Sequence, residues 1–300
     1  MQNNSMKQEF VMQVTCSDSP GLVMNFASFV TNSGGNITDA DFHCDATTGI
    51  FCARLEWTYP LEHRLSQPQK FSLVEEMLQT HFSAPNFSNL NYLKWSLHNA
   101  AKPPRVCIWV SKQDHCLVDL LHRRALQELN CEIPLIISNH KNLQKYVESF
   151  GVEFYYTPIV PDSKLQSEEI QLKLMQEFNI ELIILGKYMQ VLSANFLSHY
   201  NGNIINIHHS FLPAFAGASP YHRAFERGVK LIGATAHYVT QDLDAGPIIA
   251  QDVAQMTHHD TVDDLIRKGR DVERMVLARA VRLHLQRRVI VVGNKTVVFL

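Results

Sequence analysis

Several features that mark whole classes of protein are missing from this 300-residue sequence. No apolar run approaches the ~20 residues of a membrane-spanning helix. The first ten residues, MQNNSMKQEF, lack the apolar core of a secretory signal. Lysine and arginine number 27 against 29 aspartates and glutamates, so no basic excess points to nucleic acid or to an anionic membrane. These absences predict a soluble, cytoplasmic protein that binds neither.

Cysteine is scarce, and its spacing excludes two further classes. The six cysteines form no CxxC pair and all lie in the first half of the chain, which predicts reduced thiols and neither a disulfide framework nor a zinc site. The doublets His208-His209 and His258-His259 do not change this prediction. Neighbouring residues in an extended chain point apart and cannot share one ion. We therefore expect no metal site.

A covalent acyl-enzyme is not indicated either, because no GxSxG elbow is present. The adjacent His115 and Cys116 invite a Cys–His nucleophile, but sequence neighbours rarely meet in that geometry, so a packing role is favoured. Whether these two residues contribute to an active site stays open at this level.

What the sequence does contain is enough apolar material for two domains. Hydrophobic residues make up 46% of the chain, and the length corresponds to about two domains. Residues 99–104 (NAAKPP) form the expected linker, because Pro-Pro continues neither a helix nor a sheet ladder. We expect a first domain over residues 1–98 and a second over 105–300, without internal repeats.

The first domain shows alternating strand and helix patterns in the order βαββαβ. This order is typical of an α+β ferredoxin-like fold, with two helices on one face of an antiparallel sheet. The strands are expected at 8–16, 40–44, 51–57 and 93–97, with helices around Leu22–Val30 and Val74–His81.

The second domain shows short continuous apolar runs separated by helical stretches. This alternation predicts an α/β fold with a mostly parallel sheet covered on both faces. A long helix is expected after Asp260, and a hairpin around Gly293-Asn294 closes the chain. The apolar runs lie at 105–110, 133–137, 181–185 and 203–207, and the helical stretches near 116–129, 141–150, 164–178 and 193–200. Further along, a helix is expected at 220–228 after an irregular loop made of Leu212-Pro213 and residues 217–220, and a strand is expected at 231–239.

Polar residues gather around the end of the 203–207 strand. Asn206 and His208 stand two apart, so both side chains should lie on one face of the strand and His209 on the other. Strand ends of this kind are where open α/β sheets bind ligands. A second strand carries His237 and leads to a Gly-Pro loop that holds Asp244, which we expect to face the first strand's end.

An amide, an imidazole and a carboxylate that converge in one cleft suit acyl transfer. The amide would donate to a developing oxyanion, the imidazole would protonate or stabilise, and the carboxylate would activate a nucleophile or balance the imidazole's charge. Taken singly, each residue favours a plainer interpretation: Asn206 as a strand-end residue, His208 as a buried hydrogen-bonded histidine and Asp244 as a solvated acid.

The ordered motifs resemble the signature of the folate-dependent formyltransferases. The match consists of Asn206-Ile207-His208, Ser210-Phe211-Leu212-Pro213, His237 and Leu243-Asp244-Ala245-Gly246-Pro247. The His-His version of the first motif, and His115-Cys116-Leu117, look closest to the formyltetrahydrofolate deformylases of that family. Those enzymes also carry an N-terminal ACT-type regulatory module, so the resemblance covers essentially the whole chain and implies a Rossmann-like formyltransferase fold.

The resemblance implies three catalytic groups and two folate-binding loops. Asn206 would hold the formyl oxygen, His208 would stabilise the tetrahedral intermediate, and Asp244 would position the imidazole and a water. No cofactor is implied beyond the folate substrate, 10-formyltetrahydrofolate. The implied folate-binding residues are Met189, Gln190, Val191, Leu192, His237, Thr240, Gln241, Asp242 and Leu243.

Water is the expected acceptor of the formyl group, giving tetrahydrofolate and formate for purine and one-carbon metabolism. A nucleotide acceptor needs a phosphate cradle, typically Gly-rich, at a helix start. Residues 111–116 (SKQDHC) contain no glycine and one acid, and we expect their side chains and neighbours to close the acceptor cavity. Two alternatives remain open: formyl transfer to a non-phosphorylated amine, and a folate or amino-acid sensor without turnover. The intact Asn206, His208 and Asp244 set argues against the sensor.

The ACT-type module implies regulation and self-association. Such modules usually pair with one another, and effectors sit near the first strand–helix loop. We therefore expect a homo-oligomer with a small effector, such as an amino acid, whose carboxylate meets backbone amides at the helix start. The implied effector-binding residues are Asp18, Ser19, Pro20, Gly21 and Leu22.

Overall fold

The computed structural model describes residues 8–59, 67–160, 163–213 and 220–300. Their contacts form two compact units, which are described separately. The first unit ends at Lys102 and also takes in Gln286–Val292 and Val297–Leu300. The second unit consists of Pro103–Leu285 and Gly293–Thr296. The C-terminal hairpin, which the sequence pattern placed with the second domain, therefore groups largely with the first.

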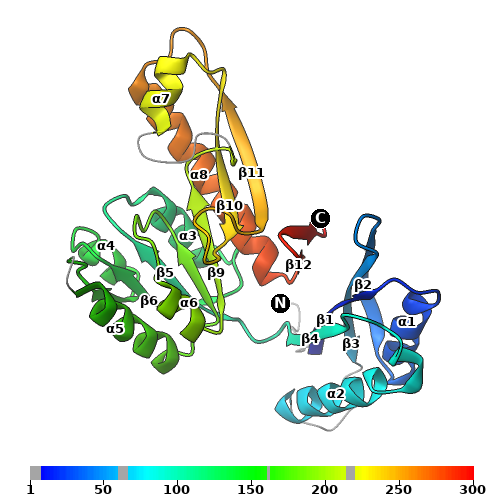
Figure 1. The fold of residues 1–300 in the computed structure, drawn as a ribbon. Coiled ribbons are helices and arrows are strands. Elements are labelled where there is room, and N and C mark those ends of the chain that lie inside the picture. Colours follow the sequence, from blue (N-terminus) through cyan, green and yellow to red (C-terminus); the bar gives the residue numbers. More distant parts are fainter. Residues whose placement is uncertain (1–7, 60–66, 161–162, 214–219) are drawn as a thin grey trace, which may run out of the picture. The chain divides into compact units, whose positions relative to one another are not determined.

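The first unit is a four-stranded antiparallel sheet with two helices, in the strand order β2-β3-β1-β4 (Figure 1). This arrangement confirms the α+β ferredoxin-like prediction. The sheet buries an aromatic core, in which Phe10 stacks on Trp57 with ring centroids 5.7 Å apart. Its elements are β1 (Gln8–Ser17), α1 (Leu22–Asn32), β2 (Asn36–Asp45), β3 (Ile50–Tyr59), α2 (Gln67–Phe82), a short 3-10 helix η1 (Pro85–Phe87) and β4 (Lys94–Asn99).

The C-terminal hairpin joins this unit through both apolar and charged contacts. It is formed by β12 (Val289–Val292) and β13 (Lys295–Val298). Ile290, Val292 and Phe299 form a buried cluster with Cys52 of β3. Arg288 pairs with Asp39 of β2 at 2.7 Å. These partners lie more than 200 residues away along the chain, so local sequence pattern could not assign the hairpin to its unit.

The second unit is built on a seven-stranded sheet in the order β11-β10-β9-β8-β5-β6-β7. The pairs from β9 to β7 are parallel, whereas β10 is antiparallel to both of its neighbours, which confirms a mostly parallel sheet. The sequence pattern missed β7, which is only four residues long, and β11, whose apolar residues are interrupted by polar ones. The strands are β5 (Arg105–Val110), β6 (Glu132–Ser138), β7 (Glu153–Tyr156), β8 (Leu182–Leu185), β9 (Asn203–His208), β10 (Leu231–Tyr238) and β11 (Ile248–Gln255).

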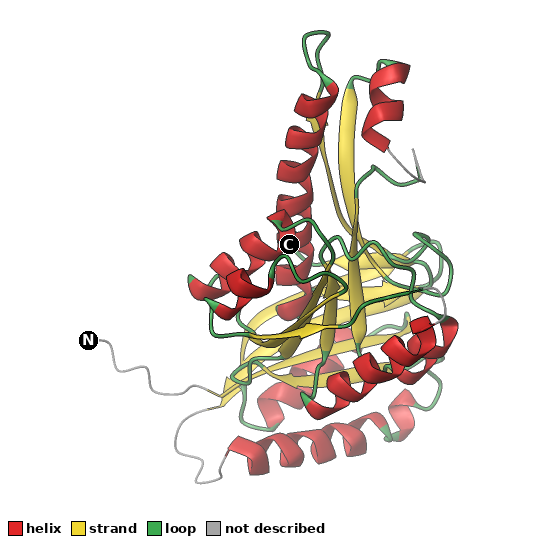
Figure 2. Ribbon diagram, turned by 90° about the vertical axis from the view of Figure 1, so that its left-hand side faces the viewer, coloured by secondary structure: helices red, strands yellow, loops and turns green. Residues whose placement is uncertain are grey.

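Helices cover both faces of this sheet. One face packs on α5 and α6 through a cluster that includes Trp109, Met175 and Phe196. On the other side α3 packs against the long α8, which runs beside β10 and β11 (Figure 2). Within the described ranges, no helix is both long and apolar enough to cross a membrane. The helices are α3 (His115–Ala125), α4 (Gln144–Glu148), α5 (Lys164–Glu177), α6 (Ala194–His199), α7 (Pro220–Arg227) and α8 (Val262–Leu285).

The strand order reverses beside β5, and this position matters for ligand binding. From β5 the chain proceeds to β6 and β7 on one side, and then to β8 and β9 on the other. In open α/β sheets, ligands bind in the crevice outside the carboxyl ends of the strands at such a switch point. A ligand site is therefore expected at the carboxyl ends of β5, β8 and β9.

Candidate active site

The side chains of Asn206, His208, His237 and Asp244 meet at the carboxyl end of β9. Asp244 contacts two imidazoles: its Oδ2 lies 3.2 Å from Nδ1 of His208, and its Oδ1 lies 3.6 Å from Nε2 of His237. Asn206 lies opposite His237 in the β9–β10 register, with its Nδ2 3.2 Å from Nε2 of that ring. The three residues expected to be catalytic are thus brought together, and His237 links two of them.

The loop after β10 is shaped to bring Asp244 back over the strand ends. Asp244 itself has a left-handed backbone with φ of 54°, a conformation that few residues other than glycine adopt. Two residues later, Gly246 lies so close to the carbonyl oxygen of Tyr238 that a Cβ would overlap it. Unusual backbone geometry of this kind concentrates at functional sites. The Leu-Asp-Ala-Gly-Pro motif therefore has a structural reason for its glycine.

The electrostatics of the cluster keep Asp244 ionised. Its contacts with His208 and then with His237 hold the pKa of the carboxyl far below its usual range. Nδ1 of His237 donates to the Tyr238 carbonyl at 2.9 Å, which leaves Nε2 to face Asn206 and Asp244. Nε2 of the buried His208 has no hydrogen-bond partner among the described residues. Unpaired buried nitrogens are uncommon, so this atom is a candidate contact for substrate.

An open pocket of about 440 Å³, including its solvent-filled mouth, adjoins the cluster. It is bounded by the two loops that were expected to hold folate. Gln190, Val191 and Leu192 line one side, and the run from Thr240 to Asp244 lines the other, with Asn206 and His237 at the strand ends. Met189 is not among its lining residues and is 60% exposed. Leu185, Leu197 and Val239 add apolar walls that sequence reasoning did not single out.

His209 does not occupy the position that strand alternation predicted. The strand ends at His208, so the two-residue period no longer applies one residue further on. The rings of His208 and His209 lie 5.1 Å apart, and the His209 ring lies 6.2 Å from that of Tyr221. Burial, and next the nearby charge of Lys187, lower the pKa of His209 to about 4. His209 is therefore a neutral neighbour of the cluster, not a residue on the opposite face.

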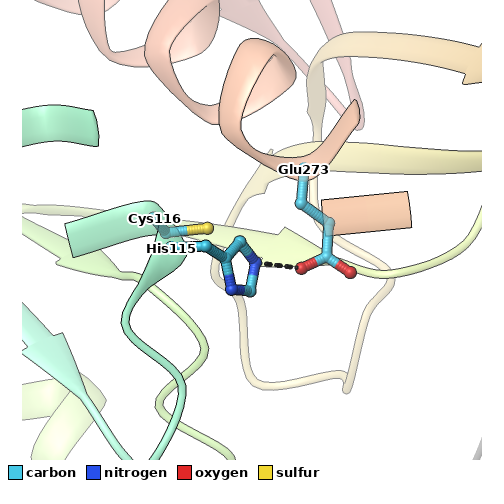
Figure 3. A group of neighbouring side chains, drawn as sticks. All are labelled: His115, Cys116 and Glu273. Atoms are coloured by element: carbon cyan, nitrogen blue, oxygen red, sulfur yellow. Dashed lines mark hydrogen bonds and ion pairs between the residues drawn. The ribbon is translucent and has the colours of Figure 1, made fainter. Parts of the chain in front are cut away.

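A second polar cluster is buried nearby, around Glu273 of α8 (Figure 3). Nε2 of His115 lies 2.7 Å from Oε2 of Glu273. The hydroxyl of Tyr221 donates to Oε1 at 2.7 Å, and Nζ of Lys187 lies 3.4 Å from the same oxygen. Glu273 and Lys187 are 1% and 4% exposed. Sequence reasoning singled out His115 and Cys116 but gave no role to the residues that surround them, because they come from three other segments.

This second cluster fits neither a nucleophile nor a metal site well. Burial, and next the charge of Glu273, raise the pKa of the Cys116 thiol well above its usual value, so the reactive thiolate is disfavoured. Ligand atoms of His115, Cys116 and Glu273 lie within 4.8 Å of one another. However, the Glu273 carboxylate already accepts three donors, and the ammonium group of Lys187 would repel a cation. The packing interpretation of Cys116 therefore agrees with its surroundings.

The 111–116 segment before α3 turns half of its side chains inward. Lys112, Gln113 and Asp114 are exposed, and only Ser111, His115 and Cys116 of the 111–116 segment turn inward. Ser111 donates to Asn139 at 2.7 Å. The acid of this segment, Asp114, is exposed, and the buried carboxylate beside His115 is that of Glu273, which sequence reasoning did not single out.

The expected effector segment forms the turn between β1 and α1. Gly21 precedes the helix with a left-handed φ of 88°, and no side chain caps the first helical amides. Asp18 and Pro20 are exposed, whereas Leu22 is 4% exposed and belongs to the core, so only its backbone could meet a ligand. Most of the irregular loop expected at 217–220 lies outside the described residues.

Comparison with known proteins agrees with this geometry. Residues 104–281 match the formyl transferase family. A formyltetrahydrofolate deformylase of Synechocystis sp. is 51% identical over 290 residues, which cover 95% of this chain and 96% of that protein. The crystal structure of a formyltetrahydrofolate deformylase from Pseudomonas syringae pv. tomato superposes with a TM-score of 0.90 at 40% identity, covering 99% of this chain and 96% of that one.

A more distant solved structure matches the second unit's fold. It is a glycinamide ribonucleotide transformylase 1 from Symbiobacterium toebii, with a TM-score of 0.61 at 26% identity, and the match covers 66% of this chain and 94% of that one. The family match, the 51% identity over nearly the whole chain and the motifs that meet at the end of β9 point to the same family. The chain belongs to the formyl transferase family and, within it, to the formyltetrahydrofolate deformylases.

Proposed function

We propose that the protein hydrolyses 10-formyltetrahydrofolate to tetrahydrofolate and formate. The observation that carries the proposal is the contact of Asp244 with both His208 and His237 beside Asn206, at the edge of the pocket bounded by residues 190–192 and 240–244. The pterin of the folate would enter between these two loops. Its formyl group would then reach the end of β9.

The chemistry requires one water and no cofactor beyond the folate. Asp244, held ionised by its two histidines, would orient the attacking water. As the new carbon–oxygen bond forms, negative charge grows on the formyl oxygen, and Asn206 and His208 would donate to it. Collapse of the tetrahedral intermediate breaks the bond between carbon and N10. The proton that the attacking water loses would pass through His208 to the folate nitrogen, and the formyl carbon leaves as formic acid, which ionises to formate.

Hydrolysis is distinguished from formyl transfer by the acceptor. The test is formate release by purified protein from 10-formyltetrahydrofolate, with and without added glycinamide ribonucleotide. We expect formate at the same rate in both mixtures and no formylated nucleotide. Faster folate turnover with the nucleotide, together with its formylated product, would replace the hydrolase assignment with a transferase. In a cell, the formate released would be available to purine and one-carbon metabolism.

We also propose that the first unit binds a small effector and that the protein is a homo-oligomer. The turn from Asp18 to Leu22 presents uncapped backbone amides at the start of α1, which suit a carboxylate. Light scattering at micromolar concentration and kinetics across a panel of amino acids test the two parts. A monomer whose kinetics no amino acid changes would contradict both.

A further inference from the structure

The crevice at the sheet's switch point is bounded by the segments that follow β5 and β8. These strands are adjacent and parallel, with Trp109 opposite Leu185 near their carboxyl ends. After β5 the chain reaches the start of α3 at His115, and after β8 it reaches Lys187. The switch point makes this an expected place for a ligand, and the start of α3 favours an anionic group there.

Side chains of the protein fill this place. His115 and Lys187 extend from the two bounding segments, Glu273 comes from α8 and Tyr221 from α7, and together these four residues form the Glu273 network (Figure 3 shows two of them). The backbone is adapted to it at two points. Lys187 has a left-handed φ of 66°, and a Cβ at Gly269 would overlap the Tyr221 hydroxyl.

Glu273 is ionised in this network, and its carboxylate is paired with Lys187 and His115. Burial by itself raises the pKa of Glu273, but the hydrogen bond from His115, the charge of Lys187 and the bond from Tyr221 lower it to about 2. A phosphate placed here would meet that carboxylate and would find its donors already engaged. Burying an ion pair costs desolvation, and apolar residues of similar volume often give equal stability. Net stability alone therefore does not account for a buried charged network at this position.

The network adjoins the site proposed for formyl chemistry. Its Tyr221 ring lies 6.2 Å from the His209 ring, which lies 5.1 Å from the ring of His208. We propose that the Glu273 network closes the switch-point crevice to a phosphate-bearing acceptor, and that this closure leaves water to take the formyl group. The inference rests on the proposed hydrolysis and names the residues that determine its acceptor.

Inorganic phosphate is the probe, because it tests the closure without requiring turnover. In Glu273→Ala, the donors of His115, Lys187 and Tyr221 lose their carboxylate and surround a space that an anion can enter. We expect phosphate to raise the Tm of this variant by about 5–10 °C at about 100 times its Kd, relative to chloride at equal ionic strength. Wild-type protein should show no such phosphate-specific rise.

Two matched variants separate charge from space. His115→Ala also opens space but keeps the Glu273 carboxylate, so phosphate should not stabilise it. Glu168→Ala removes another buried glutamate of the same unit, which accepts from the Ser193 amide at 2.9 Å and has no lysine partner among the described residues. It should show no phosphate response either. If Glu273→Ala does not fold, His115→Gly combined with Glu273→Gln opens the space, removes the charge and keeps a partner for Lys187.

The acceptor is then tested directly with glycinamide ribonucleotide. The variant that binds phosphate should yield formylated nucleotide from 10-formyltetrahydrofolate, or lose formate release as the nucleotide is added, whereas wild-type protein should do neither. Equal phosphate stabilisation of wild type and Glu273→Ala, or stabilisation of neither folded variant, would overturn the inference. Failure of the wild-type protein to release formate would instead overturn the proposed hydrolysis, whatever the phosphate response.

Discussion

Two polar clusters lie near each other in the second unit, and they differ in what they leave unpaired. In the Asp244 cluster, the carboxylate is partly exposed beside an open pocket, and Nε2 of His208 has no partner among the described residues. In the Glu273 network, both carboxylate oxygens are occupied and the side chain is 1% exposed. A carboxylate beside an open pocket, such as Asp244, can contact a substrate. A carboxylate whose oxygens already accept hydrogen bonds from the protein, such as Glu273, fills space and keeps a charged group at a fixed position.

The largest effect on turnover should follow from removing the charge of Asp244. Asp244→Asn keeps the volume, and asparagine tolerates the φ of 54° found there. We expect kcat for formate release to fall by about 10²–10⁴-fold, the usual contribution of a positioned acid–base group, with the fold and folate affinity nearly intact. Steady-state kinetics with circular dichroism and folate binding test this. Asp252→Asn, which removes an acid on β11 outside the cluster, is the control, and near-wild-type turnover by Asp244→Asn would remove Asp244 from the mechanism.

Removing the Asn206 amide from the Asp244 cluster should lower turnover somewhat less. Asn206→Ala removes the proposed oxyanion donor and the contact at 3.2 Å to His237. We expect kcat to fall by about 10²–10³-fold with a smaller change in KM, because the bond strengthens as charge develops. Asn203→Ala on the same strand is exposed and serves as the control. A rise in KM with kcat unchanged would indicate a binding role instead.

Breaking the Glu273 network should lower the free energy of unfolding. Lys187→Met leaves the Glu273 carboxylate buried without its cation, and we expect the free energy of unfolding to fall by about 3–5 kcal/mol. Arg279→Met breaks an exposed ion pair with Asp252 and should cost about 0–1 kcal/mol. Urea unfolding of the two variants gives the comparison. Equal losses of unfolding free energy would show that the buried Lys187–Glu273 pair contributes no more to stability than an exposed ion pair.

His209, which lies between the two clusters, should make the free energy of unfolding depend on pH, with a smaller effect than the changes above. Because the pKa of His209 is lowered from 6.5 to about 4, the unfolded chain binds a proton in this interval that the folded chain does not. The contribution of His209 to stability should therefore be complete above pH 6.5 and fall as the pH drops toward 4, by on the order of 1–3 kcal/mol. Urea midpoints across this interval, for wild type and His209→Gln, measure it. Burial also lowers the pKa of His98, to about 3, and that of His81, so both proteins lose stability in this interval and the difference between their slopes reports His209. Equal slopes would show that His209 contributes none of the loss.

Local pattern was sufficient for most elements of the fold. Apolar alternation over 51–57 located β3, and the continuous apolar run at 105–110 located β5, because strand burial leaves a direct trace in residue type. The pattern failed for β7, which is too short to show a period, and for the C-terminal hairpin, whose partners lie in the first unit. It also failed at His209, where the end of the strand changes the side-chain direction.

The sequence by itself determined the family and the Asp244 cluster. Asn206 and His208 lie on one strand, and Asp244 belongs to a motif whose Gly246 packs closely against the backbone of Tyr238. Short-range geometry and the order of the motifs are therefore enough to predict this cluster. Only the tertiary structure decided the Glu273 network. Its four members come from α3, the segment after β8, α7 and α8, and no spacing along the chain records that they meet. Hydrogen bonding in a buried space depends on packing between distant segments, which a one-dimensional pattern does not carry.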